Sequence, residues 1–506
     1  MNGPPSAAGR LAVPGVVAAL YVVAHVVTIG EYGLFRDEFY YLACARRLAW
    51  GYVDHPPLVA VIAWAGTAVF GDDPFGIRIL SVLSGAGAIV VTALLTTRLG
   101  GRRFAQLVAC SAVAVAPHYL FVFHILSMNG SEVLLWTLAG YLAVTAVQDR
   151  RPAVWMLLGA VCGLGLLNKH SMLVFGLGLA VGLAATPARR ALATPWPWLA
   201  GALAGGIFLP HVLWQVQHGW PTLEFIRNAQ AHKIADISMT DFLREQVLMT
   251  SPFAVPVWLA GLAACLRRRA AAEWRLLGWC YVVVLAVFLL QKAKPYYVMP
   301  AYPLLLAPGA IVLERWIRWR SGRLLSLSLL LAGGALIAPL ALPVLSVPRF
   351  VAYQRAIGIE PGRQENHELG ALPQHYADMF GWEELARTIS AVYLSLPEEA
   401  RATARVYASN YGQAGSLEYF ARRYPLPPVI SAHNNYWYWG PGEEGGTLIA
   451  IGATQADWEE GFEDVRLVAR TSCTYCMPYE NGVPIFVGRG WRLRLRDIWP
   501  GEKKFI

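Results

Sequence analysis

Residues 11–29 read LAVPGVVAALYVVAHVVTI, a run of nineteen residues without a charged side chain. A helix of about 20 residues crosses the ~30 Å hydrocarbon core of a bilayer, so this run is long enough to be a membrane span. Arg10 precedes it, as a charged residue precedes the apolar core of a signal peptide. The run is longer than a usual signal core, however, and no small-x-small cleavage site precedes the acidic loop that follows. We therefore expect a retained transmembrane helix.

The whole chain has the composition of a protein that lipid surrounds. Of its 506 residues, 56% are hydrophobic and 15% are charged, and the mean hydropathy is +0.42. A water-soluble fold would have difficulty burying so much apolar surface. The formal charge of +9 comes from arginine clusters between apolar runs, which does not indicate a nucleic-acid partner.

Ten further apolar runs follow the first, which makes about 11 predicted transmembrane helices. They lie near residues 77–97, 104–123, 131–148, 153–167, 171–186, 197–214, 251–266, 276–291, 296–313 and 324–345. The sequence therefore predicts an α-helical polytopic membrane protein.

The arginines predict the orientation of these spans because they occupy every second loop. They are Arg98, Arg102 and Arg103; Arg150 and Arg151; Arg189 and Arg190; Arg267 to Arg269 and Arg275; and Arg315, Arg318, Arg320 and Arg323. By the positive-inside rule these loops and the N-terminus are cytoplasmic. The outward loops are then 30–76, 124–130, 168–170, 215–250 and 292–295, and the tail after the eleventh span also lies outside.

The predicted domains are a transmembrane domain, 1–347, and an extracytoplasmic α/β domain, 348–506. Within the first outer loop, residues 57–70 are apolar but too short to span, and residues 38–50 mix apolar residues with Arg46 and Arg47. Both segments suit helices at the membrane interface. The tail has dispersed charges, with strand-like stretches at 405–409, 447–451 and 484–487 and a helical one at 416–423.

The strongest candidate for chemistry is RDEFYY, residues 36–41, just beyond the first span. Asp37 and Glu38 are adjacent carboxylates at the membrane boundary, where charge is costly and often functional. Tyr40 and Tyr41 follow as candidate ligand-orienting groups. The alternative is a pair of hydrated interfacial charges, one neutralised by Arg36.

A second motif is DHPPL, residues 54–58, at the far end of the predicted interfacial helix. The two prolines fix an extended turn that can hold Asp54 or His55 over the membrane surface. The alternative is that the prolines merely end one element and begin the next.

The first span, the outer-loop Asp-Glu with a following Tyr, and then Pro-Pro-Leu resemble the family 39 glycosyltransferases of the GT-C superfamily. That family includes the protein O-mannosyltransferases, the lipid A aminoarabinose transferases and the RgtA/B/C/D-like bacterial enzymes. The resemblance implies a polyprenyl-phosphate sugar donor, residence in the plasma (inner) membrane and a catalytic base at Asp37. It leaves a divalent cation open, because some relatives bind one. His55 departs from the family pattern, in which Lys or Gln is common.

Cations at the outer ends of later spans suit a phosphate leaving group. Relatives carry similar Lys-containing and Tyr-Tyr-x-x-Pro segments near the lipid phosphate. The predicted donor-phosphate residues are Arg36, Lys169, Lys294, Tyr296 and Tyr297. The alternative is that these lysines and tyrosines are interfacial anchors.

Further candidates would orient the acceptor or the sugar. Glu132 begins a span on the outer side, where an acidic first turn after Ser131 explains it equally well. In the tail, Asn410 follows a predicted strand and opens a helix. His433, Asn434 and Asn435 lie in a run rich in amides and aromatic residues, which suits a carbohydrate surface or an inward-packed core.

Cys473 and Cys476 are spaced as CxxC. They lack the other ligands of a zinc site and the βαβ setting of a thioredoxin motif. A local disulfide is the inference that remains, because an oxidising outer compartment permits one.

The sequence thus predicts an inverting membrane glycosyltransferase that moves a sugar from a polyprenyl-phosphate donor to an extracytoplasmic glycan, lipid or protein, with an Asp general base. Two alternatives stay open. A transporter or lipid flippase would carry charges near the midplane of the membrane and symmetry between halves. A non-catalytic sugar-binding assembly subunit would use only the tail.

Overall fold

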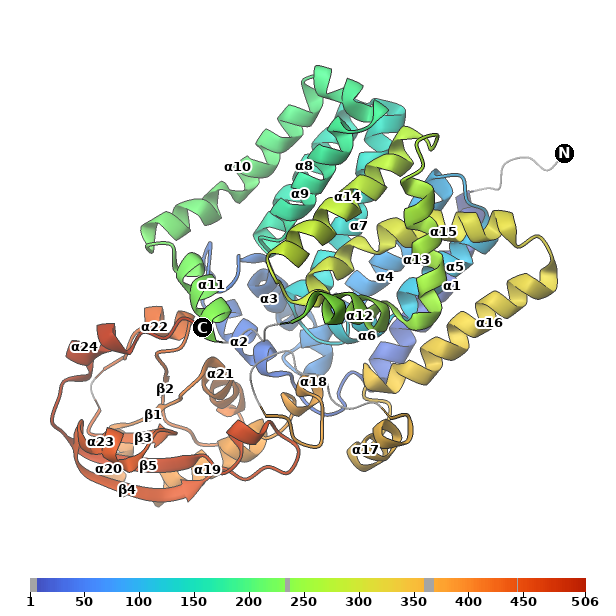
Figure 1. Ribbon diagram of the computed structural model, residues 1–506. Helices are drawn as coiled ribbons and strands as arrows, with labels where there is room; N and C mark the ends of the chain where they lie inside the picture. Colours follow the sequence, from blue (N-terminus) through green and yellow to red (C-terminus); the bar gives the residue numbers. More distant parts are fainter. Residues whose placement is uncertain (1–6, 233–236, 359–367, 444) are drawn as a thin grey trace. The chain divides into compact units, whose positions relative to one another are not determined.

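The computed structural model describes residues 7–232, 237–358, 368–443 and 445–506 (Figure 1). Contacts divide the chain into two compact units. The first, a helical unit, comprises residues 1–31, 66–213 and 236–350, and the second, a sheet unit, comprises 32–65, 214–235 and 351–506. Residues 32–65 of the predicted outer loop 30–76 therefore belong to the same unit as the tail, whereas the sequence grouped them with the spans. The predicted boundary after residue 347 stays a prediction. Residues 233–236 of the predicted outer loop 215–250 lie outside the described residues.

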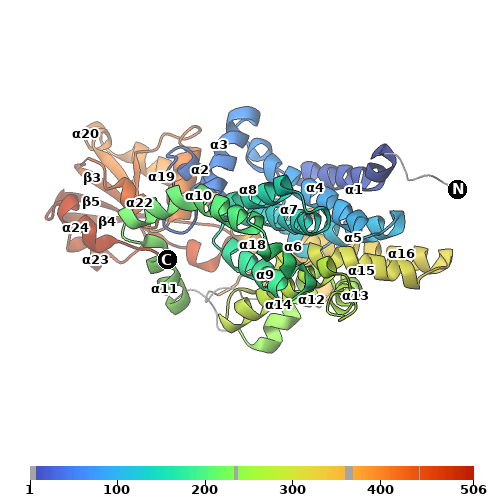
Figure 2. The ribbon, with the colours of Figure 1, turned by 90° about the horizontal axis from the view of Figure 1, so that it is seen from above.

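The helical unit is a bundle around a large apolar core. Its helices are α1 (Ala7–Thr28), α4 (Pro74–Arg98), α5 (Arg103–Ala114), α6 (Pro117–Val122), α7 (Met128–Asp149), α8 (Pro152–Asn168), α9 (Met172–Ala184), α12 (Met239–Thr250), α13 (Val255–Cys265), α14 (Ala272–Leu290), α15 (Pro303–Trp316) and α16 (Arg320–Ile337). Short 3-10 turns are η1 (Pro187–Ala193), η2 (Pro252–Ala254), η3 (Pro295–Ala301) and η4 (Ala338–Leu340). Neighbours such as α7 and α8 run side by side in both ribbon views (Figures 1 and 2).

Three helices cross from one unit's residues into the other's: α3 (Leu58–Phe70), α10 (Trp196–Gln217) and α17 (Val347–Ala356). α10 exposes apolar side chains such as Trp198, Leu209 and Leu213. Exposed leucines in such number suit a lipid-facing surface.

Among the described residues, six helices are long and apolar enough to cross a membrane, and nine if each bent helix pair is one span. All eleven predicted runs are helical, but the run 104–123 is split because Pro117 begins α6, and α8 has only 17 residues. The bent pairs are α9 with η1 (104°), α12 with the η2 and α13 segment (88°), and η3 with α15 (56°). Prolines open the second member of each pair, since a proline removes a backbone donor and fixes φ.

The sheet unit contains, among the described residues, a five-stranded sheet in the order β2-β1-β3-β5-β4. The strands are β1 (Ala404–Tyr407), β2 (Val429–Ile430), β3 (Thr447–Ile451), β4 (Phe462–Arg470) and β5 (Pro484–Trp491). β1 pairs in parallel with β2 and β3, whereas β5 pairs antiparallel with β3 and β4. A small core that includes Leu448 and Phe486 lies against this sheet.

The helices of the sheet unit are short. They are α2 (Arg36–Ala45), α11 (Pro221–His232), α18 (Gln374–Ala377), α19 (Trp382–Ser395), α20 (Glu398–Ala402), α21 (Tyr411–Phe420), α22 (Asn435–Trp439), α23 (Gln455–Glu459) and α24 (Leu495–Ile498), with 3-10 turns η5 (Pro478–Glu480) and η6 (Trp499–Glu502). The three predicted strands correspond to β1, β3 and β5, and the predicted helix to α21. α2 packs along α21, which brings the first loop against the tail within one unit.

Candidate functional site

Asp37 lies in the first turn of α2 with part of its carboxylate exposed. Its side chain is 30% accessible. Oδ1 accepts a hydrogen bond of 2.8 Å from the hydroxyl of Tyr411, and the Nε of Arg36 lies 3.3 Å from the same oxygen. Oδ2 makes no hydrogen bond to any described residue. The carboxylate is therefore held through one oxygen while the other can accept a proton.

Arg36 is fixed from several sides. Its Nη1 donates to the hydroxyl of Tyr479 at 2.9 Å and lies 3.7 Å from Oδ2 of the buried Asp378. Its backbone N–H donates to the carbonyl of Asp378 at 3.0 Å. The guanidinium lies 5.5 Å from the ring centroid of Tyr411. Because its contacts are carboxylates and tyrosines, Arg36 is better placed to orient Asp37 than to bind a phosphate.

Glu38 has a different environment from its neighbour. It is fully buried, and its Oε2 accepts a 2.7 Å hydrogen bond from the backbone N–H of Phe35, the N-cap of α2. A carboxylate at this position satisfies a backbone donor and favours the helix dipole. This contact gives Glu38 a helix-capping role. Its catalytic role stays a prediction.

Asp54 lies beside the same helix. Its Oδ1 accepts a 2.9 Å hydrogen bond from the hydroxyl of Tyr40, whose ring packs 4.9 Å from that of Tyr411. Burial raises the pKa of Asp54 above its ordinary value. Tyr40 therefore connects Asp54 to the cluster of aromatic rings around Asp37.

His55 is fully buried, and its ring lies beside that of Tyr40. Its Nδ1 lies 2.8 Å from the carbonyl of Pro56, and its ring packs edge-on against Tyr41 at 5.2 Å. Burial lowers the pKa of His55, so the ring is kept neutral. His55 and Tyr41 are thus packed groups, and neither side chain is exposed.

The tail residues proposed for the acceptor make structural contacts. Asn410 caps α21 by accepting from the N–H of Gln413 at 2.9 Å. His433 accepts from the N–H of Tyr411 at 3.3 Å, and Asn435 accepts from the N–H of Val53 at 3.0 Å. Their partners, like their burial, favour the inward-packed alternative for this run.

Asn434 belongs to the same run and is fully buried at a φ of 49°. Its Oδ1 accepts from the N–H of Ile506 at 3.2 Å. Its Nδ2 has no hydrogen-bond partner among the described residues. Asn434 therefore stays a candidate polar contact for a ligand.

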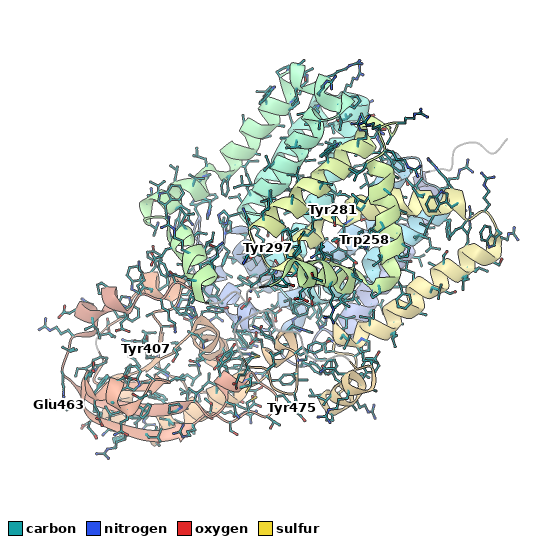
Figure 3. All side chains as sticks on the ribbon, viewed as in Figure 1. Trp258, Tyr281, Tyr297, Tyr407, Glu463 and Tyr475 are labelled. Atoms are coloured by element: carbon teal, nitrogen blue, oxygen red, sulfur yellow. The ribbon has the colours of Figure 1, made fainter. Side chains whose placement is uncertain are left out.

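Lys169, a predicted donor-phosphate residue, lies in the helical unit and forms an ion pair. Its Nζ lies 2.8 Å from Oε2 of Glu132 and 2.8 Å from Oδ1 of Asn129. The ammonium also faces the ring of Tyr297 at 4.3 Å and that of Tyr296 at 5.4 Å; Tyr297 is labelled in Figure 3. Glu132 is therefore the counter-ion of Lys169, and Ser171 donates to its other oxygen.

Lys294 is the residue before η3 and is partly buried. The structure thus groups the predicted phosphate residues Lys169, Tyr296 and Tyr297 with Glu132 in the helical unit. It groups Arg36, Asp37, Tyr40, Asp54 and the tail residues in the sheet unit. No group of three or more His, Cys, Asp or Glu side chains in the described parts of the chain is placed to hold a metal ion.

Sequence reasoning missed four residues of the Asp37 environment: Asp378, Tyr411, Tyr479 and Glu480. Tyr411 directly follows Asn410, which was predicted to open a helix, and this position was the available signal. Asp378 follows the short helix α18 and Tyr479 lies in the 3-10 turn η5, and neither position has a local sequence pattern, so only the fold identifies them.

The fold of this chain is that of the GT-C superfamily of membrane glycosyltransferases, as the resemblance implied, and the chain is a polytopic membrane protein. It superposes on the ArnT structure from Cupriavidus metallidurans bound to undecaprenyl phosphate with a TM-score of 0.60 and 16% sequence identity, over 95% of this chain and 98% of that chain. The apo structure of the same protein gives a TM-score of 0.62 with 15% identity, over 93% and 97%.

Sequence comparisons agree with this assignment. Residues 54–214 match the family model described as dolichyl-phosphate-mannose-protein mannosyltransferase, a range that includes Glu132 and Lys169 but not Asp37. The chain is 27% identical over 379 residues to undecaprenyl phosphate-alpha-4-amino-4-deoxy-L-arabinose arabinosyl transferase 1 of Pseudomonas fluorescens, covering 67% of this chain and 64% of that protein. It is 25% identical over 311 residues to the lipid A galacturonosyltransferase RgtD of Rhizobium johnstonii, covering 58% and 63%. The chain therefore spans slightly less than two thirds of the length of these relatives.

Proposed function

We propose that this chain transfers a sugar from a polyprenyl-phosphate carrier to an acceptor on the extracytoplasmic face of the plasma (inner) membrane. The fold and the named activities of the relatives support this class of reaction. The observation that carries the proposal is the partly exposed carboxylate of Asp37, held by Tyr411 and Arg36 with one oxygen left to accept a proton.

In the proposed reaction, Oδ2 of Asp37 removes the proton from an acceptor hydroxyl as that oxygen attacks the anomeric carbon of the donor. The bond between the anomeric carbon and the phosphate oxygen breaks, and the polyprenyl phosphate leaves with its electron pair. The attack comes from the face opposite the phosphate, so the configuration inverts and no covalent enzyme intermediate forms. Tyr411 and Arg36 orient the carboxylate.

The leaving phosphate is proposed to meet Lys169, Lys294 and the tyrosines of η3. An ammonium has three donors, and Glu132 and Asn129 take two of those of Lys169. The third remains for an anionic oxygen. Glu132 then holds Lys169 in place, in contrast to the acceptor-orienting role that the sequence predicted for it.

The orientation follows from the arginine distribution, with the N-terminus cytoplasmic and the tail extracytoplasmic. The acceptor is a glycan, a lipid or a protein. A divalent cation stays open as a further component.

The test is a deletion strain complemented with the wild-type chain, in which polyprenyl-phosphate sugars and envelope glycans are measured by mass spectrometry. We expect a polyprenyl-phosphate sugar to accumulate in the deletion strain and its sugar to disappear from one envelope acceptor, with both changes reversed by complementation. A flippase predicts accumulation on the cytoplasmic leaflet instead, which a membrane-impermeant probe of the sugar distinguishes. Unchanged lipid-linked sugars and unchanged acceptors would contradict the proposal.

A further inference from the structure

The CxxC motif lies in the loop that joins β4 to β5, residues 471–483. Cys473 and Cys476 are both thiols in this structure. The N–H of Cys476 donates to Sγ of Cys473 at 3.1 Å, and Sγ of Cys476 donates to the carbonyl of Cys473 at 3.6 Å. Both sulfur atoms therefore lie in one tight turn around Tyr475, which Figure 3 labels.

The two thiols differ in reactivity. A hydrogen bond from the Cys476 side chain lowers the pKa of Cys473 to about 7, whereas the pKa of Cys476 is raised. Cys473 is also the more exposed of the two and lines a small surface pocket with Phe380 and Gly381. Cys473 is thus suited to attack an incoming disulfide, and Cys476 to complete the exchange.

The same loop holds both helices that position Asp37. Its Tyr479 hydroxyl accepts from Arg36 at the start of α2. Its Glu480 carboxylate accepts from Asn410 at 2.9 Å and from Gln413 at 2.8 Å at the start of α21. Glu480 is buried, so these two hydrogen bonds replace those that its carboxylate would make to water.

The cysteines also pack on the segment that carries Asp378. A Cβ added to Gly381 would lie 3.2 Å from Sγ of Cys473 and 3.2 Å from Cβ of Cys476, and Gly381 has a φ of +91°. Because that segment contacts Arg36 through Asp378, the loop of residues 471–483 contacts three elements around the Asp37 carboxylate: the segment that carries Asp378 through the CxxC turn, α2 through Tyr479 and α21 through Glu480.

We propose that Cys473 and Cys476 are a redox-modification site, oxidised to a disulfide outside the cytoplasm, and that this bond fixes the loop that positions Arg36 and Tyr411 around Asp37. The oxidant is the disulfide of a thiol oxidoreductase. The Cys473 thiolate attacks it to form a mixed disulfide, and Cys476 then displaces the oxidant, which leaves as a dithiol after accepting two electrons. The link to Asp37 rests on the proposed function, whereas the bond itself does not.

The first experiment measures the bond. The full-length protein is purified from the membrane in detergent without reductant, denatured and treated with a maleimide, and its peptides are analysed by mass spectrometry. We expect the 473–476 peptide to be unmodified and 2 Da lighter than its reduced form, with both cysteines modified after reduction. The matched control is Cys110, a buried thiol of the helical unit, which should be modified in both samples. Full modification of Cys473 and Cys476 without reductant, even after incubation with oxidised glutathione, would overturn the proposal.

The second experiment measures the coupling by hydrogen exchange. Oxidised wild type is compared with reduced wild type and with the double variant Cys473→Ala/Cys476→Ala. Loss of the bond should speed exchange about tenfold in peptides from the starts of α2 and α21 and leave α7 unchanged, because only local opening is affected. Equal exchange in all three samples would overturn the coupling. Neither readout needs turnover, so a failure here is distinct from a failure of the proposed transferase activity.

Discussion

The hydroxyl of Tyr411 donates a 2.8 Å hydrogen bond to Oδ1 of Asp37 across 374 positions of sequence. The same ring lies under the guanidinium of Arg36 and beside the ring of Tyr40. One tyrosine of the tail therefore contacts three residues of the first loop. The tail contributes directly to the surroundings of the proposed base, and the first-loop motif is incomplete without it.

Tyr411→Phe removes this hydrogen bond and keeps the ring. A net hydrogen bond contributes about 0.5–1.5 kcal/mol, and more when one partner is charged, so turnover should fall by roughly 3- to 20-fold with the fold retained. The control is Tyr393→Phe, whose hydroxyl donates, within the described part of the chain, to a backbone carbonyl at 3.4 Å. Equal turnover in the two variants would remove Tyr411 from the account.

Substitutions of Glu38 distinguish a helix-capping role from a catalytic role. Glu38→Gln keeps an oxygen for the N–H of Phe35, so the variant should retain turnover within a few-fold. Glu38→Ala loses the cap and should lower stability by about 0.5–2 kcal/mol, measured by thermal unfolding in detergent. If Glu38→Gln instead abolishes turnover while its unfolding temperature is unchanged, Glu38 is catalytic after all.

Lys169 and Glu132 form a buried ion pair, with side-chain accessibilities of 11% and 3%. Removing one partner leaves an uncompensated charge, which typically costs about 3–5 kcal/mol. Lys169→Met and Glu132→Gln should therefore each lower the unfolding temperature more than the double variant does. Additive losses in this cycle would show that the pair is not coupled.

His55 makes the free energy of unfolding depend on pH. Burial lowers its pKa in the folded state below the ordinary value of 6.5, although Asp54 partly opposes this shift. The unfolded chain then binds more protons than the folded one at acidic pH, so this contribution is present above about pH 6.5 and is lost as pH falls through the folded pKa. Between pH 7.5 and 5.5, wild type should lose more unfolding temperature than His55→Asn. A larger loss in the variant would reverse the sign of this argument.

The helices of the membrane portion followed from the sequence because long apolar runs have one main structural solution in lipid. All eleven runs are helical in the described residues, whereas their lengths depended on prolines such as Pro117. The strands β1, β3 and β5 and the cap at Asn410 were also recognisable. β4 was not expected, because its FEDVRLVAR sequence mixes charges with apolar residues and most of it is exposed.

The surroundings of the site were less predictable. Arg36 and Tyr479 form a hydrogen bond although 443 positions separate them in the sequence, and no local pattern predicts such a contact. The ion pair of Lys169 and Glu132 was easier to predict from the sequence, since both residues lie at predicted outer ends of nearby spans. Considered one at a time, Lys169 was assigned to the donor phosphate and Glu132 to the acceptor or the sugar. The fold shows that the two side chains form an ion pair.

The central claim is that Asp37 accepts the proton of the acceptor hydroxyl. Asp37→Asn keeps the size and the Tyr411 hydrogen bond but removes the base. The most direct measurement is single-turnover transfer from an isolated polyprenyl-phosphate sugar by reconstituted wild type and Asp37→Asn, with donor binding measured in parallel. The account predicts a loss of about 100- to 10,000-fold in transfer with donor affinity within a few-fold of wild type. Transfer at the wild-type rate by Asp37→Asn would contradict it.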